Sequence, residues 1–130
     1  MDKINKNIYI GNSSDADNLD NDRKITAILN VAFDLNRKWF NEKISLKIGL
    51  VDGPSEENKI TVPLAIEVLK KLILNNCIIL VHCHQGQNRS PFIVAKTLSL
   101  LNDTSWVEEF QKIKEIRPEV FIKDWMYKFD

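Results

Sequence analysis

A cysteine, an arginine and a serine lie close together in the second half of the chain. Cys83 lies six residues before Arg89, and Ser90 follows directly. A thiolate is a strong nucleophile, a guanidinium fork can bind two phosphate oxygens, and a hydroxyl can donate a hydrogen bond to sulfur. The spacing therefore indicates chemistry at phosphorus, with Cys83 as the nucleophile and Arg89 holding the phosphoryl oxygens.

The residues around this group predict a strand, a loop and a helix. Gly86 permits a tight turn, Pro91 suits the first helical position, and Ser90 suits the N-cap. The backbone N–H groups of the loop can then converge on one anion at the positive end of the helix, an environment that also favours a thiolate. The expected phosphate-binding residues are His84, Gln85, Gly86, Gln87, Asn88 and Arg89.

Strands and helices alternate along the rest of the chain. We expect strands at 8–10, 25–32, 45–51 and 77–81, a loop or weak helix at 13–22, and helices at 61–76, 91–101, 105–117 and 121–129. This alternation predicts an α/β fold of three layers, with a central, mostly parallel sheet of four to five strands flanked by helices. Asp52 and Cys83 both follow predicted strands, so this topology can bring them to one edge of the sheet.

The composition is that of an ordinary soluble domain. With 130 residues, 44% of them hydrophobic, the chain can bury one core, so we expect a single domain over residues 1–130. Basic and acidic residues number 18 each, and this zero net charge argues against a nucleic-acid or membrane-surface partner. The start has no apolar stretch typical of a signal peptide, and we expect a monomeric, cytoplasmic protein.

The two cysteines are expected to be free thiols. A strand between Cys77 and Cys83 would separate them by roughly 20 Å, whereas a disulfide needs Cα atoms within about 7 Å. Free thiols fit a reducing compartment. The run His82, Cys83, His84 does not predict a metal site, because neighbouring strand side chains point to opposite faces and no further ligand cluster is present in the sequence.

The segment from Val81 to Pro91 resembles the signature of the dual-specificity and protein-tyrosine phosphatase superfamily, in which His-Cys is followed by five residues and Arg-Ser or Arg-Thr. The triplet Arg89-Ser90-Pro91 is most similar to the dual-specificity branch. Further segments resemble that branch, so the likeness covers most of the chain: residues 8–11, 25–32, 50–52 and 117–118.

The resemblance implies a cysteine-dependent phosphatase that needs no metal or cofactor. Cys83 would form a cysteinyl-phosphate, and Asp52 would protonate the leaving oxygen and then activate the water that releases phosphate. Ser90 would donate a hydrogen bond to the sulfur. His82 would support the loop from behind, although a core histidine satisfied by its surroundings would occupy the same place.

Two residues leave alternatives open. Asp52 also suits a plain turn before Gly53, and in that case Glu56 or Glu57 would supply the proton. His84 is either an exposed loop residue or a substrate contact, and we expect it to be exposed.

Asn88 departs from the dual-specificity pattern, which usually has Ser or another small residue there. Asn at this position resembles the RNA 5′-triphosphatases of capping enzymes, but an amide can also bridge backbone groups. The sequence predicts a protein phosphatase acting on phosphotyrosine, with phosphoserine and phosphothreonine as further candidates. The alternatives are an RNA 5′-triphosphatase, a phosphoinositide phosphatase, a non-catalytic phosphate-binding module, and a redox or sulfur-transfer protein with the same loop.

Aromatic and basic residues elsewhere suggest ordinary structural roles. We expect eight aromatic side chains to pack in the core: Trp39, Phe40, Trp106, Phe110, Phe121, Trp125, Tyr127 and Phe129. We expect four lysines on a solvated face: Lys112, Lys114, Lys123 and Lys128.

Overall fold

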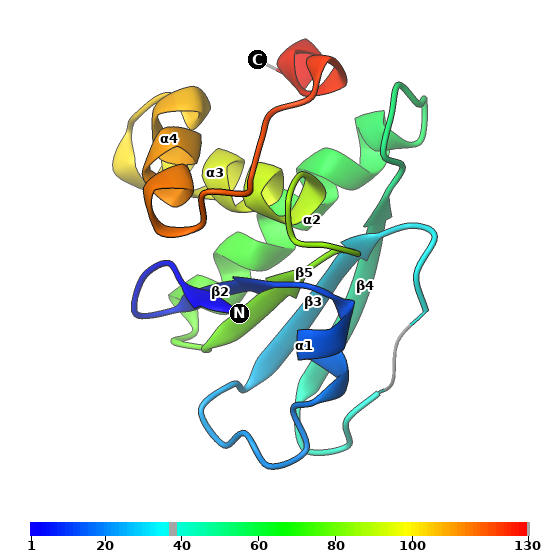
Figure 1. The fold of residues 1–130 in the computed structure, drawn as a ribbon, viewed down its shortest axis with the longest axis vertical. Helices are drawn as coiled ribbons and strands as arrows, with labels where there is room; N and C mark the ends of the chain where they lie inside the picture. Colours follow the sequence, from blue (N-terminus) through cyan, green and yellow to red (C-terminus); the bar gives the residue numbers. More distant parts are fainter. Residues whose placement is uncertain (37–38, 130) are drawn as a thin grey trace.

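A five-stranded sheet forms the centre of the computed structural model, which describes residues 1–36 and 39–129 (Figure 1). The strands are β1 (Asp2–Lys3), β2 (Ile8–Gly11), β3 (Ala27–Ala32), β4 (Ile44–Leu50) and β5 (Ile79–His82), in the spatial order β1-β2-β5-β3-β4. Only β1 is antiparallel to its neighbour. The predicted α/β fold with a mostly parallel sheet is confirmed, and β1 is a short strand that the sequence pattern did not reveal.

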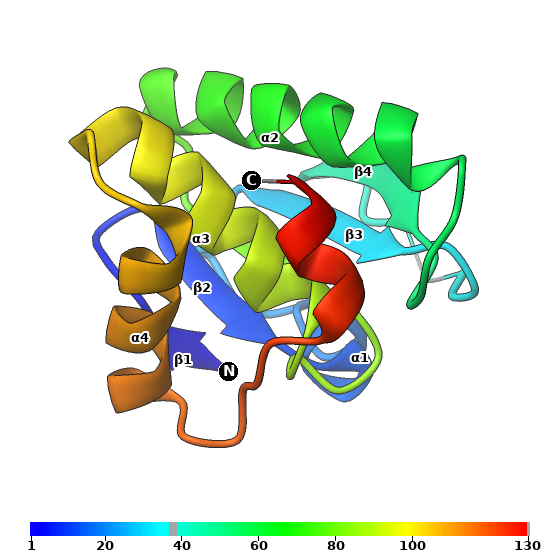
Figure 2. The ribbon, with the colours of Figure 1, turned by 90° about the horizontal axis from the view of Figure 1, so that it is seen from above.

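Helices cover both faces of the sheet, as a three-layer fold requires (Figure 2). They are α1 (Ser13–Asp17), α2 (Asn58–Leu74), α3 (Arg89–Asn102) and α4 (Trp106–Ile116), followed by the 3-10 helix η1 (Asp124–Phe129). The larger core lies between the sheet and α2, α3 and α4, and a smaller cluster lies beneath α1. No helix among the described residues is long and apolar enough to cross a membrane.

The strand β5 occupies the middle of the sheet because it is apolar on both faces. Ile79 and Val81 point into the larger core, and Leu80 points into the smaller cluster, as the alternation of strand side chains requires. His82 follows on the same face as Leu80. The loop after β5 therefore begins from a strand that is fixed on both sides.

The start of α2 differs from the expected one. The helix begins at Asn58, three residues before Thr61, and Pro63 lies inside it rather than in its first turn. The Asn58 side chain accepts a hydrogen bond from the Val51 N–H and donates to the carbonyl groups of Val51 and Gly53. These contacts fix the turn after β4 and allow the helix to begin early.

The aromatic residues do not all lie in the core. Phe92 is fully buried, and the rings of Trp106 and Trp125 meet it edge-on with centroids 5.3 and 5.5 Å away. This packing joins α3 to α4 and to the C-terminal segment. By contrast, Trp39, Phe121 and Tyr127 have exposed fractions of 64%, 46% and 48%, so the prediction of core positions for them was wrong.

Replacing Phe92 by alanine should lower the free energy of unfolding by about 3–5 kcal/mol, because a large buried ring leaves a cavity. Urea denaturation measures this loss. Leu100→Ala is the matched control, since Leu100 lies on the same helix with an exposed fraction of 61%. Equal losses in the two variants would contradict this account of the core.

Candidate active site

A pocket of about 340 Å³ lies where the loop between β5 and α3 faces the ends of other elements. The loop contributes Cys83 to Gln85 and Gln87 to Arg89, and the remaining lining residues are Asp34, Asp52, Phe121 and Lys123. The structure therefore brings Asp52 and Cys83 together, as the parallel topology predicted. Gly86 is the one expected phosphate-binding residue that does not line the pocket.

Cys83 and Ser90 face each other across the loop. The Cys83 Sγ lies 3.3 Å from the Ser90 Oγ, and both residues are buried. The predicted N-cap role of Ser90 was wrong: α3 begins at Arg89, Asn88 occupies the cap position, and no side chain among the described residues caps the helix there. The Ser90 hydroxyl is directed at the sulfur instead, and the first-turn N–H groups remain available for an anion.

Arg89 is held by one end of its guanidinium group. Its Nη1 donates to the Leu50 carbonyl at 3.0 Å and to the Asp34 Oδ1 at 2.7 Å. Within the described part of the chain both contacts use Nη1, which leaves the Nε and Nη2 edge for two phosphate oxygens. The side chain is almost fully buried, with an exposed fraction of 6%, so its direction is well defined.

Asp34 is a residue of this site that sequence reasoning missed. Its hydrogen bond to Arg89 holds the pKa of the Asp34 carboxyl below its ordinary value, so the carboxyl is ionised at neutral pH. Its Oδ2 lies 3.3 Å from the Nε2 of His84, which is exposed as predicted. Asn30 fixes the turn that carries Asp34, because its side chain donates to the Leu35 carbonyl and accepts from the Ala32 N–H.

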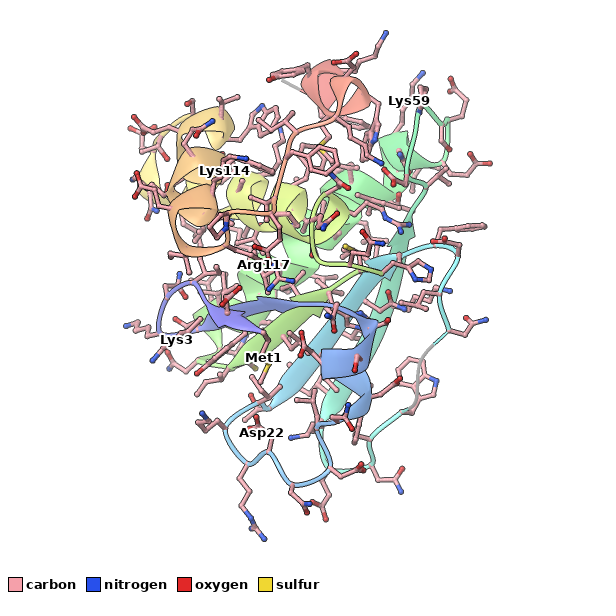
Figure 3. All side chains as sticks on the ribbon, viewed as in Figure 1. Met1, Lys3, Asp22, Lys59, Lys114 and Arg117 are labelled. Atoms are coloured by element: carbon pink, nitrogen blue, oxygen red, sulfur yellow. The ribbon has the colours of Figure 1, made fainter. Side chains whose placement is uncertain are left out.

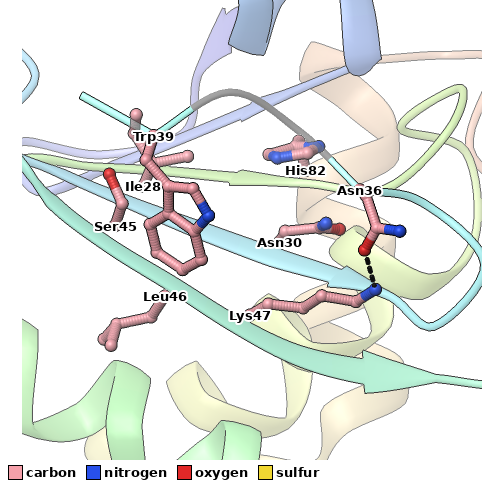
Figure 4. A pocket seen from close by; sticks show the side chains of 8 residues that line it. All are labelled: Ile28, Asn30, Asn36, Trp39, Ser45, Leu46, Lys47 and His82. Carbon is pink, nitrogen blue, oxygen red and sulfur yellow. Dashed lines mark hydrogen bonds between the residues drawn. The ribbon is translucent and has the colours of Figure 1, made fainter.

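His82 lies behind the loop rather than in the pocket. Its Nδ1 is 3.2 Å from the Cys83 carbonyl oxygen, and the residue is fully buried. The ring borders a smaller cavity of about 190 Å³, beside Asn30 on the neighbouring strand and near Trp39 (Figure 4). This placement is compatible with the expected supporting role and equally with a buried core histidine, since His82 contacts the backbone at Cys83 and does not line the pocket that contains the thiol.

Arg117 holds the loop from outside. Its Nε donates to the Gly86 carbonyl at 2.9 Å and its Nη2 to the Gln85 carbonyl at 3.1 Å, while its Nη1 pairs with Asp2 at 2.7 Å. Figure 3 shows Arg117 between α4 and the N-terminal residues. With these carbonyl groups turned outward, the loop can direct N–H groups toward the pocket.

Gly86 is required by this close packing. Its φ of +68° lies in the left-handed region, and a Cβ there would come within 2.6 Å of the Gly11 carbonyl oxygen and 2.7 Å of Arg117. The glycine therefore allows the loop to lie directly against β2 and Arg117.

Asp52 reaches the pocket from the end of β4 and is held by two donors. Lys123 Nζ lies 2.6 Å from its Oδ2, and the indole Nε1 of Trp125 donates to its Oδ1 at 3.4 Å. The prediction of a solvated face was wrong for Lys123. Glu56 and Glu57, the alternative acids, do not line the pocket: Glu56 pairs with Lys59, and Glu57 accepts from Ser55.

Asn88 connects the loop to the segment after α4. Its Nδ2 donates to the Phe121 carbonyl at 2.7 Å, and the Phe121 N–H donates to the Gln87 carbonyl at 3.0 Å. The Asn88 side chain therefore contacts a backbone group, as the structural alternative supposed, but this group lies 33 residues away and outside the loop.

The profile of the family described as "Dual specificity phosphatase, catalytic domain" matches residues 8–128. The chain belongs to this family, as its resemblance indicated. A mouse relative, dual specificity protein phosphatase 19, is 28% identical over 97 residues, which cover 75% of this chain and 44% of the mouse protein. The chain thus matches less than half the length of that relative.

Solved structures share the fold. The crystal structure of DUSP15 is 26% identical with a TM-score of 0.85, covering 97% of this chain and 81% of that one. Human DUSP28 is 17% identical with a TM-score of 0.85, covering 98% and 91%. The human tyrosine phosphatase-like serine/threonine/tyrosine-interacting protein is 18% identical with a TM-score of 0.83, also covering 98% and 91%.

Replacing Arg117 by methionine should weaken the binding of inorganic phosphate about tenfold or more, because two charge-assisted hydrogen bonds to loop carbonyl groups are lost. Isothermal titration calorimetry measures the affinity, and circular dichroism checks the fold. Arg23→Met is the control, since Arg23 is exposed. A folded Arg117→Met protein with unchanged phosphate affinity would show that the loop keeps its shape without this contact.

Proposed function

We propose that this chain is a protein phosphatase that hydrolyses phosphotyrosine, and also phosphoserine and phosphothreonine, through a cysteinyl-phosphate intermediate. The observation that carries the proposal is that Asp52 lines the same pocket as Cys83 and Arg89, although it follows a different strand from the one that leads into their loop. Membership of the dual-specificity family supports the same chemistry. Residues 1–130 would act as a single, monomeric catalytic domain without a metal.

In the first step, the Cys83 thiolate attacks phosphorus as the bond to the leaving oxygen breaks. Asp52 transfers a proton to that oxygen, so a neutral alcohol or phenol departs. The free edge of Arg89 and the loop N–H groups stabilise the charge on the equatorial oxygens. The Ser90 hydroxyl donates a hydrogen bond to the sulfur, which steadies the thiolate before the attack.

In the second step, water attacks the phosphorus of the cysteinyl-phosphate. Asp52, now a carboxylate, accepts a proton from this water, the sulfur–phosphorus bond breaks, and inorganic phosphate leaves. Cys83 returns to the thiolate, to which Ser90 again donates its hydrogen bond. Lys123 pairs with the Asp52 carboxylate that forms in the first step and accepts a proton in the second, and the Trp125 indole also donates to it.

The charges of the pocket favour a phosphorylated protein over RNA or lipid substrates. Each cationic side chain of the lining already has a carboxylate partner: Arg89 pairs with Asp34, and Lys123 pairs with Asp52. A 5′-triphosphate or a multiply phosphorylated inositol would add negative charge beside these carboxylates. The contact between Asn88 and Phe121 also gives Asn88 a structural role that does not involve RNA.

The thiol chemistry suits the cytoplasm. Cys77 and Cys83 are both free, and a reducing compartment keeps a nucleophilic thiol out of disulfides. We therefore propose that the protein acts in the cytoplasm.

Wild-type protein should release phosphate from p-nitrophenyl phosphate, whereas Cys83→Ser should show no activity above background, because a neutral hydroxyl cannot replace the thiolate. Release of p-nitrophenolate measures this. Cys77→Ser, which changes the other thiol, should keep wild-type activity. A wild-type protein as inactive as Cys83→Ser would support a non-catalytic phosphate-binding module instead.

Asp52→Asn should lower kcat for phenyl phosphate by about 100-fold, the usual contribution of a general acid. The loss of kcat should be smaller for p-nitrophenyl phosphate, because p-nitrophenolate is a stable anion that can leave without being protonated by an acid. Steady-state kinetics with both esters measures the difference. If Asp52→Asn keeps full activity and Glu56→Gln or Glu57→Gln loses it, the acid assignment moves to that glutamate.

A further inference from the structure

An aromatic ring stands at the mouth of the proposed phosphate pocket. Phe121 lines the pocket, and its exposed fraction is 46%. Among the described residues that line this pocket, Phe121 alone has a hydrocarbon side chain. Single exposed apolar side chains are common on protein surfaces, so Phe121 is informative because of its place in the lining of this polar pocket.

The backbone of Phe121 is fixed relative to the loop. Its N–H donates to the Gln87 carbonyl, and its carbonyl accepts from the Asn88 side chain, so two consecutive loop residues hold it. The preceding residue, Val120, is fully buried, and its carbonyl accepts a hydrogen bond from Lys114 at 2.7 Å. The ring is therefore presented from a rigid backbone beside the residues expected to bind phosphate.

The surroundings of the ring select against a highly charged substrate. Lys123 Nζ lies 6.0 Å from the ring centroid and is itself paired with Asp52. A substrate that enters beside Phe121 therefore meets an aromatic face and the one ammonium group of Lys123. Aromatic rings stack or meet edge-on with other rings, so the best match is a phosphate ester carried on a ring.

We propose that Phe121, positioned by Asn88, makes the enzyme prefer phosphotyrosine to phosphoserine and phosphothreonine. This inference rests on the proposed protein phosphatase function and names the preferred residue. The phosphate of phosphotyrosine is separated from its backbone by a ring, which can lie against Phe121 while the phosphate occupies the loop. The short side chains of phosphoserine and phosphothreonine carry no ring for this contact.

The test uses two peptides of identical sequence, phosphorylated on tyrosine or on threonine at the same position. Phe121→Ala should raise KM for the phosphotyrosine peptide about fivefold, as expected for the loss of one aromatic pair, with kcat unchanged. kcat/KM for the phosphothreonine peptide should change less than twofold. Phe121→Leu, which keeps an apolar side chain without the ring, should behave like Phe121→Ala.

Two further variants separate selectivity from damage to the loop. Tyr127→Ala is the matched control, because Tyr127 is as exposed as Phe121 but does not line the pocket. Asn88→Ala removes the contact that holds Phe121 and should reduce the preference for phosphotyrosine in the same direction. Inorganic phosphate, used as a competitive inhibitor, should bind Phe121→Ala and wild type equally.

Equal losses on both peptides, or a weakened binding of phosphate by Phe121→Ala, would overturn the proposal and make Phe121 a support of the loop. An unchanged preference for phosphotyrosine would also overturn it. Calorimetry with the Cys83→Ser protein, with and without Phe121→Ala, measures peptide binding without turnover. If wild type hydrolyses neither peptide, the proposed function fails, and the binding ratio still decides the role of Phe121.

Discussion

The shape of the loop between β5 and α3 depends on hydrogen bonds made to its outer side. Arg117 binds two loop carbonyl groups, and the Ser13 N–H donates to a third, that of His84, at 2.9 Å. A peptide group that turns its carbonyl outward turns its N–H inward, so these contacts favour an anion at the centre. Because Arg117 is buried and also pairs with Asp2, the N-terminal strand shares in holding the loop.

The fold was largely predictable because its signals are local. The apolar run that contains β3 and the alternation in β4 identified strands, and the strand-loop-helix pattern around Cys83 located the loop correctly. The element boundaries were less predictable. The hydroxyl of Ser90 serves the Cys83 sulfur instead of capping α3, and Asn58 starts α2 early by binding the preceding turn. Each difference arises from a tertiary contact that competes with a local preference.

The site residues that lie together in one segment could be predicted from the sequence. Those that reach the site from distant segments were harder to predict. Cys83 and Arg89 belong to one short motif, and Asp52 could be placed by topology. Asp34 and Lys123 carry no local signal, because a single charged residue after a strand or in a C-terminal segment is usually solvated. Their roles as partners of Arg89 and Asp52 depend on pairings across 55 and 71 residues, which no local pattern encodes.

The contacts of the C-terminal segment set an order in which the site can be assembled during synthesis. The ribosome would release Asp34, Asp52 and the Cys83 loop long before Arg117, Phe121 and Lys123. Until those last residues appear, the carbonyl groups of Gln85 and Gly86 lack the partner that turns them outward, and Asp52 lacks the ammonium group that holds it. Contacts of such long sequence separation form late in folding. A partly synthesised chain would therefore carry the thiol without an organised pocket, and phosphate binding would appear only once the segment from Arg117 to Lys123 is added.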